Sequence, residues 1–105
     1  MTDRELLEAA ARAAGIELVW LDDVKPGYFD GDASLWRDWN PLRSDGDAFR
    51  LAVKLGMDVR QLLGINEVHV YMGVGMTWEP FGCDPYAATR RAVVRAAASL
   101  WKGAE

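Results

Sequence analysis

The stretch DPYAATRRAVVRAAASLWKG (residues 84–103) is the longest helical pattern in the chain. Asp84 is a favoured N-cap residue, Pro85 suits the first helical position, and Gly103 is typical of the residue that ends a helix. One face of this pattern is apolar and the other is basic (Val93, Val94, Ala97, Leu100 and Trp101 against Arg91, Arg95 and Lys102). We therefore expect an amphipathic helix from Pro85 to about Lys102.

Two shorter helices are predicted upstream. Thr2 and Glu5 form the spacing of a capping box, and an alanine- and leucine-rich stripe then continues to Gly15. A second helix is expected to begin at Ser44 or Asp45 and to end at Leu55, because glycine 56 is a typical C-terminal residue. The alanine-rich faces of the first and last helices predict close packing onto a sheet.

The segments between the helices predict strands. Residues 16–21 are rich in β-branched and aromatic side chains. Residues 68–74 alternate between two faces, with Val68, Val70, Met72 and Val74 on one and His69, Tyr71 and Gly73 on the other. Residues 57–62 favour a strand, and residues 77–79 suit a short edge strand before Pro80. Residues 22–34 contain many turn formers and predict a long loop. We expect one α+β sandwich domain over residues 1–105: a small, mostly antiparallel sheet of three to four strands packed with three helices, in the order α-β-α-β-β(-β)-α.

Composition limits the classes of function. A chain of 105 residues with 50% hydrophobic and 27% charged residues is typical of one globular domain. The net charge of −4 disfavours broad nucleic-acid binding. Cys83 is the only cysteine, and we find neither an apolar leader at the N-terminus nor an apolar run long enough to cross a membrane. We therefore expect a cytoplasmic protein that does not insert into membranes.

No motif predicts a metal, cofactor or catalytic site. The Asp-Gly-Asp runs at 30–32 and 45–47 lack the ligand spacing of a calcium loop, and they suit a turn and a helix start instead. His69 is the only histidine, and Cys83 has no histidine near it in the sequence. The pair Gly73-x-Gly75 lacks the third glycine of a dinucleotide-binding fingerprint. We expect no catalytic, metal-binding or cofactor-binding residues.

A candidate interaction surface combines the segment from Trp36 to Asp47 with the arginines of the last helix. Its residues are Trp36, Trp39, Asn40, Asp45, Asp47, Arg90, Arg91 and Arg95. The two tryptophans either fill the core behind a loop or clamp a partner from the surface. The arginines either keep the helix hydrated or grip an anionic partner.

Two blocks resemble a known family. The stretches WNPLRSDGDAFRLAVKL (Trp39 to Leu55) and DPYAATRRAVVRAAASL (Asp84 to Leu100) are similar to small phage- and prophage-encoded proteins of unknown function, grouped as phage ABA-sandwich or NinX-like proteins. The resemblance covers about a third of the chain and does not extend to residues 22–35 or 57–82. It implies an α/β sandwich and a phage or prophage origin, and hence a location in the cytoplasm of a host cell. It supplies no catalytic residues.

Together these observations favour a non-enzymatic accessory protein that binds a host or phage protein. One alternative is a small ligand-binding domain or enzyme that uses Tyr71, His69 and carboxylates from the loops. Another is a weak nucleic-acid binder that uses Arg90, Arg91 and Arg95. The sequence does not determine the oligomeric state.

Overall fold

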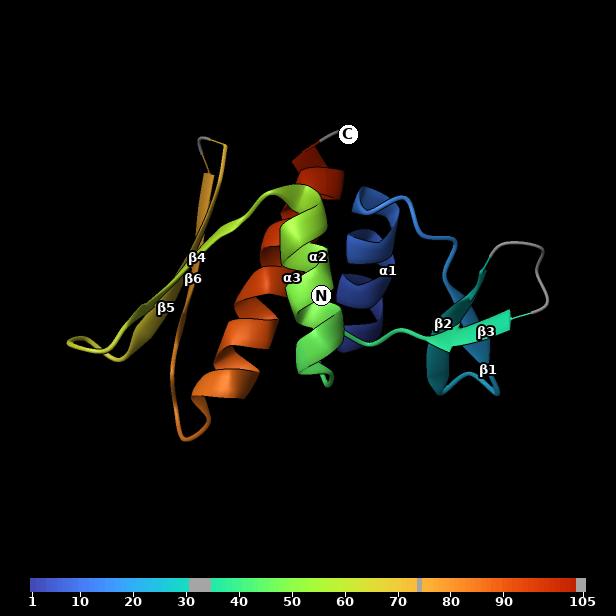
Figure 1. Ribbon diagram of the computed structural model, residues 1–105, viewed down its shortest axis with the longest axis horizontal. Helices are drawn as coiled ribbons and strands as arrows, with labels where there is room; N and C mark the ends of the chain where they lie inside the picture. The colour runs from blue at the N-terminus through green and yellow to red at the C-terminus, as the bar shows by residue number, and fades with distance from the viewer. Residues whose placement is uncertain (31–34, 74, 104–105) are drawn as a thin grey trace.

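The computed structural model describes residues 1–30, 35–73 and 75–103, and within these residues three helices lie between two three-stranded antiparallel sheets (Figure 1). The helices are α1 (Asp3–Ala13), α2 (Asp45–Leu55) and α3 (Pro85–Gly103). Sheet A contains β1 (Val19–Leu21), β2 (Lys25–Asp30) and β3 (Leu35–Asp38). Sheet B contains β4 (Asp58–Leu62), β5 (Glu67–Met72) and β6 (Gly75–Pro80). The element order is α-βββ-α-βββ-α.

The predicted α+β class is confirmed, but the expectation of one sheet of three to four strands is wrong. The supposed loop at 22–34 contains β2, which pairs with β1 on one side and with β3 on the other. The breakers Pro26 and Gly27 lie inside β2, where the small Gly27 leaves room for the indole of Trp36. The predicted turn at Asp30-Gly31 and the other predictions for residues 31–34 lie outside the described residues.

A tight turn joins β1 to β2. Asp22 and Asp23 both adopt left-handed backbone conformations (φ 53° and 61°), and the Val24 N–H donates to the Leu21 carbonyl at 3.1 Å. Two consecutive left-handed residues define the turn type that matches the twist of a hairpin, and Asn-Gly is its preferred sequence. An Asp-Asp pair carries no such signal, so the sequence reads as a loop.

All three predicted helices are confirmed, together with their N-terminal caps. The Thr2 hydroxyl accepts from the Glu5 N–H, and the Glu5 carboxylate accepts from the Thr2 N–H at 2.9 Å. Ser44, rather than Asp45, caps α2 by accepting from the Asp47 N–H at 3.1 Å. The Asp84 carboxylate accepts from two backbone N–H groups in the first turn of α3.

Helix α3 is the centre of the fold, with α1 and α2 beside it and sheet B across it (Figure 1). Helices α1 and α3 pack closely against each other, with Ala10, Ala11, Ala92 and Ala96 buried. The expected packing onto a sheet is confirmed for α3, which lies on β5 and β6, whereas α1 packs chiefly on α3. From sheet B, Val68 and Val70 are fully buried against this core. Among the described residues, no helix is both long and apolar enough to cross a membrane.

Candidate functional site: a groove between α2, β4 and α3

The structure separates the two tryptophans of the candidate interaction surface. Trp39 is 5% exposed and belongs to the hydrophobic core. Trp36 lies on the opposite face of sheet A from Trp20 and Tyr28, the two residues by which that sheet packs on the core. The core interpretation therefore applies to Trp39, whereas Trp36 is left partly exposed on the outside.

Asn40 and Asp47 stabilise the turn that leads into α2. The Asn40 side-chain oxygen accepts from the Leu42 N–H at 3.1 Å, and the Asp47 carboxylate accepts from the Asn40 N–H at 2.9 Å. Asp47 also pairs with Arg50 at 2.7 Å and is only 8% exposed. Both polar residues therefore hold the local fold.

The three arginines of α3 reach three different parts of the fold. Arg90 donates to the Leu42 carbonyl at 2.9 Å and pairs with Asp45 at 2.7 Å. Arg91 pairs with Asp3 at the start of α1. Arg95 pairs with Glu79 in β6. Each of the three guanidinium groups therefore has a carboxylate partner, and they do not converge on a common anion.

What the fold does bring together is a groove of about 840 Å³ between α2, β4 and the first half of α3. It is lined by small or apolar side chains and by four polar residues (Ala48, Phe49, Ala52, Val53, Met57, Val59, Pro85, Tyr86 and Val93; Asp45, Gln61, Thr89 and Arg90). Of the candidate interaction surface, only Asp45 and Arg90 lie here. We call this feature the α2–α3 groove.

The groove exists because α2 has small residues next to large ones. Ala48 and Ala52 are buried toward α3 and leave a hollow, whereas Phe49 and Val53, each one residue further along, are 70% and 64% exposed. Tyr86 in the first turn of α3 is also 70% exposed. Exposed apolar side chains gathered around one hollow are typical of an interaction site.

The four polar groups that line the groove bond to neighbours within the protein. Asp45 and Arg90 form the ion pair already described, at 2.7 Å. Gln61 donates to the Thr89 hydroxyl at 3.1 Å, and Thr89 donates in turn to the Pro85 carbonyl at 2.8 Å. The groove therefore offers chiefly apolar contact.

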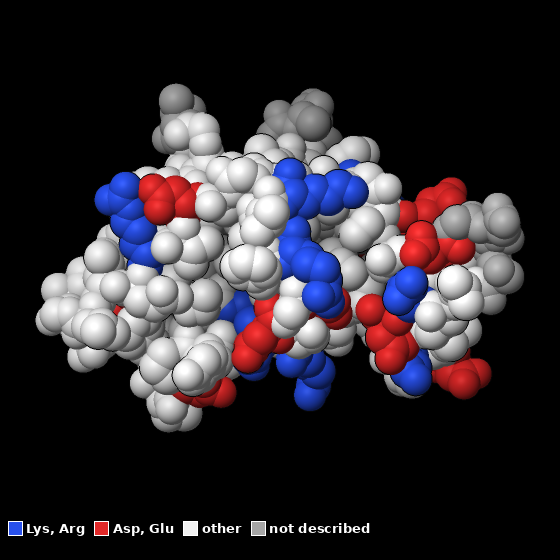
Figure 2. Space-filling view, in the orientation of Figure 1, with Lys and Arg blue, Asp and Glu red and all other residues white. Residues whose placement is uncertain are grey.

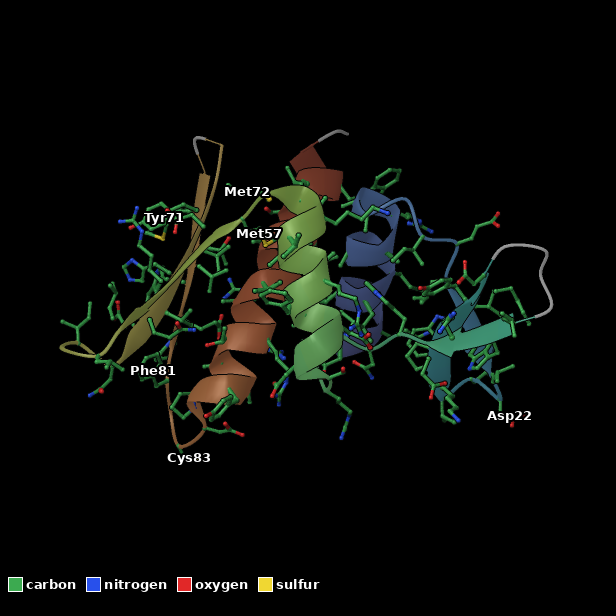
Figure 3. All side chains as sticks on the ribbon, viewed as in Figure 1. Asp22, Met57, Tyr71, Met72, Phe81 and Cys83 are labelled. Carbon is green, nitrogen blue, oxygen red and sulfur yellow. The ribbon has the colours of Figure 1, made fainter. Side chains whose placement is uncertain are left out.

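The residues of the enzyme hypothesis lie elsewhere, on the face of sheet B turned away from the helices. Figure 3 shows Tyr71 on that face and Met72 on the opposite one. His69 Nε2 lies 2.9 Å from the Glu67 carboxylate, and Nδ1 lies 3.4 Å from the Tyr71 hydroxyl. Neither His69 nor Tyr71 lines the groove.

Arg60 and Asp58 lie on the same face of sheet B as His69. The hydrogen bonds from the Arg60 guanidinium lower the pKa of Asp58 and raise that of Arg60. Within the described part of the chain, no group of three or more histidine, cysteine or carboxylate side chains could hold a metal ion.

A second hollow, also of about 840 Å³, lies between the end of α1, sheet A and α2. Its lining is mixed in charge (Glu17, Asp30, Asp38 and Asp47 with Arg37, Arg50 and Lys54). Arg37 pairs with Asp30 and Arg50 pairs with Asp47. The lining of this hollow is therefore polar and partly ion-paired, in contrast to the apolar lining of the α2–α3 groove.

In comparisons with known proteins, no family model, curated protein or solved structure matches the chain.

The sequence reasoning missed Phe49, Val53 and Tyr86. The helical spacing of α2 places Ala48, Leu51, Ala52 and Leu55 on one apolar face, and the structure buries the first three. The sequence signal that could have indicated these residues is the width of the apolar surface of α2. With Phe49 and Val53 included, apolar residues extend well beyond the stripe that one core-facing side of a helix needs.

Proposed function

We propose that this protein is a non-enzymatic binding module that holds an apolar helical segment of a partner protein in the α2–α3 groove. The observation that carries the proposal is the grouping of Phe49, Val53 and Tyr86, all at least 64% exposed, around a hollow with an apolar floor. Leaving three large apolar side chains in water beside one another is unfavourable by about 25 cal/mol for each Å² that a partner could cover.

A helix suits this groove better than an extended chain. Two of the three groove walls are side chains of α2 and α3, whose backbone groups bond within their own helices, and the third is β4, the edge strand of sheet B. Along the two helical walls, an extended segment would bring unpaired backbone groups against an apolar surface, which is costly. An amphipathic helix satisfies its own backbone and presents apolar anchors at i, i+3, i+4 and i+7.

The two alternative functions receive less support. The arginines of the nucleic-acid hypothesis each pair with a carboxylate, and the net charge of the chain is −4. The histidine and tyrosine of the enzyme hypothesis lie on an open sheet face. A small apolar ligand remains the second candidate, because about 840 Å³ falls within the usual range of small-molecule sites.

The proposal includes a phage or prophage origin and a host or phage protein as the partner. This part rests on the resemblance of residues 39–55 and 84–100 to phage and prophage proteins. Those two blocks contain α2 and most of α3, the two helices that form the groove.

Selection from a displayed peptide library against the purified protein tests the proposal. We expect enrichment of peptides with apolar residues at helical spacing. Phe49→Asp should weaken their binding at least about tenfold, because a charge would enter the apolar contact. Leu63→Asp is the matched control: Leu63 is 76% exposed but lies in the β4–β5 turn, outside the groove.

Two results would contradict the proposal. One is enrichment of peptides whose apolar residues lack helical spacing. The other is peptide binding that Phe49→Asp and Leu63→Asp weaken equally. If no peptide is selected but an apolar fluorescent dye binds and is lost in Phe49→Asp, the small-ligand alternative replaces the protein partner.

A further inference from the structure

The outer face of sheet A carries a second group of exposed apolar side chains. The strand register places Val19, Leu21, Phe29 and Trp36 on the face turned away from the core. Val19, Leu21 and Phe29 are 38%, 40% and 48% exposed. Figure 1 shows sheet A at the end of the molecule, with the helices on one side and no other described element beyond it. We call these four residues the sheet A outer face.

Trp36 is held in one orientation on this face. Its indole N–H donates to the Asp38 carboxylate at 2.7 Å, and its ring meets the ring of Phe29 edge-on, with centroids 5.2 Å apart. The indole also covers Gly27, which has no side chain to push it away. An aromatic side chain that is already ordered loses little conformational entropy on binding, and such residues dominate interface energetics.

The surroundings of this face are acidic. In residues 16–30 and 35–39, five carboxylates accompany two cations (Glu17, Asp22, Asp23, Asp30 and Asp38 with Lys25 and Arg37). Three of these carboxylates are paired: Asp38 with Lys25, Asp30 with Arg37, and Asp23 with Arg4 of α1. Figure 2 shows acidic residues, with basic ones among them, at the sheet A end of the molecule. With Arg4 included, five carboxylates and three cations leave a net charge of −2 around an apolar centre.

We propose that the sheet A outer face docks a basic protein segment, one that presents an apolar side chain between lysines or arginines. Charge complementarity selects this occupant. A second copy of the chain would bring acidic residues against acidic residues, and like charges across an interface are unfavourable. Nucleic acids and anionic membranes carry the same unfavourable charge.

This surface is distinct from the α2–α3 groove and shares none of its residues. A protein with both surfaces would bridge two partners, one helical and apolar, the other basic. The two proposals fail separately, because Phe49→Asp affects only the groove and Trp36→Ala only the sheet A outer face.

A titration followed by NMR on the ¹⁵N-labelled full chain tests the proposal. The probe is a short synthetic peptide in which leucine and phenylalanine are flanked by lysines, and the matched control peptide has glutamates in place of the lysines. We expect the lysine peptide to shift the signals of Val19, Leu21, Phe29 and the Trp36 indole N–H. Added salt should weaken this binding, and the glutamate peptide should leave those signals unchanged.

Two variants separate binding from folding. Trp36→Ala should weaken binding of the lysine peptide at least about tenfold. Asp22→Asn combined with Asp23→Asn removes two exposed charges of the β1–β2 turn, together with the exposed ion pair of Asp23 with Arg4, and should weaken binding of the lysine peptide a few fold while reducing its salt dependence. The proposal is overturned if both peptides shift the same signals, if the shifts map to the groove, or if the protein dimerises through sheet A in sedimentation.

Discussion

The indole of Trp36 lies directly over Gly27 in the neighbouring strand of sheet A. A Cβ atom at Gly27 would lie 2.8 Å from Cε2 of Trp36 and closer still to the Arg37 carbonyl oxygen. Gly27→Ala should therefore destabilise the protein by about 1–3 kcal/mol, because a backbone oxygen cannot move aside as a flexible side chain can. Chemical denaturation measures the loss. Gly64→Ala, with open space around the position, is the control and should change stability little.

Asp47 offers a second test, of a nearly buried carboxylate. Asp47→Ala leaves the Asn40 N–H without its acceptor, and we expect a loss of about 1–3 kcal/mol in the free energy of unfolding. Asp47→Asn retains an acceptor oxygen and should cost less. Arg50→Ala removes only the exposed partner of Asp47 and should cost less than about 1 kcal/mol. Equal effects of Asp47→Ala and Arg50→Ala would contradict this account.

Arg90 should contribute more to stability than its neighbour Arg91. The Arg90 side chain is 17% exposed and joins α3 to both the Leu42 carbonyl and Asp45, whereas Arg91 makes one exposed pair. We expect Arg90→Ala to cost about 1–3 kcal/mol and Arg91→Ala less than about 1 kcal/mol in urea denaturation. Comparable losses from the two substitutions would show that Arg90 does not anchor α2 to α3.

The turn between β1 and β2 can be improved. Replacing Asp22-Asp23 with Asn-Gly supplies residues that adopt positive φ angles easily and removes two adjacent like charges, at the cost of the weak, exposed ion pair of Asp23 with Arg4. We expect a gain of about 1 kcal/mol, equivalent to a rise in Tm of roughly 4–8 °C for a domain of this size. Thermal unfolding followed by circular dichroism measures it. An unchanged or lower Tm would mean that the turn adopts another conformation in solution.

Acid should weaken the capping box of α1. The Thr2 backbone N–H, and then the Thr2 hydroxyl, lower the pKa of Glu5 from its ordinary value of 4.5. A carboxyl whose pKa is lowered on folding stabilises the protein above its unfolded pKa, and that stabilisation is lost as the pH falls through the folded pKa. Stability should therefore decline below about pH 4.5, and the decline should be shallower in Glu5→Gln. Asp58→Asn is a useful comparison because the pKa of Asp58 is lowered as well, by Arg60.

The sequence was a good guide wherever a structure depends on neighbours a few residues apart. The helix caps at Thr2, Ser44 and Asp84 follow from side chains that reach backbone N–H groups two or three residues away. The alternation of Val68 and Val70 with His69 and Tyr71 likewise assigned β5 and its two faces.

The tertiary structure decided everything that depends on distant partners. Gly27 reads as a strand breaker until Trp36 lies over it, and Ala48 and Phe49 look equally apolar until α3 covers only the first. Trp36 and Trp39 differ for the same reason, since the core packs against Trp39 alone. Local propensity cannot distinguish such residues, because exposure is set by which segments fold against them.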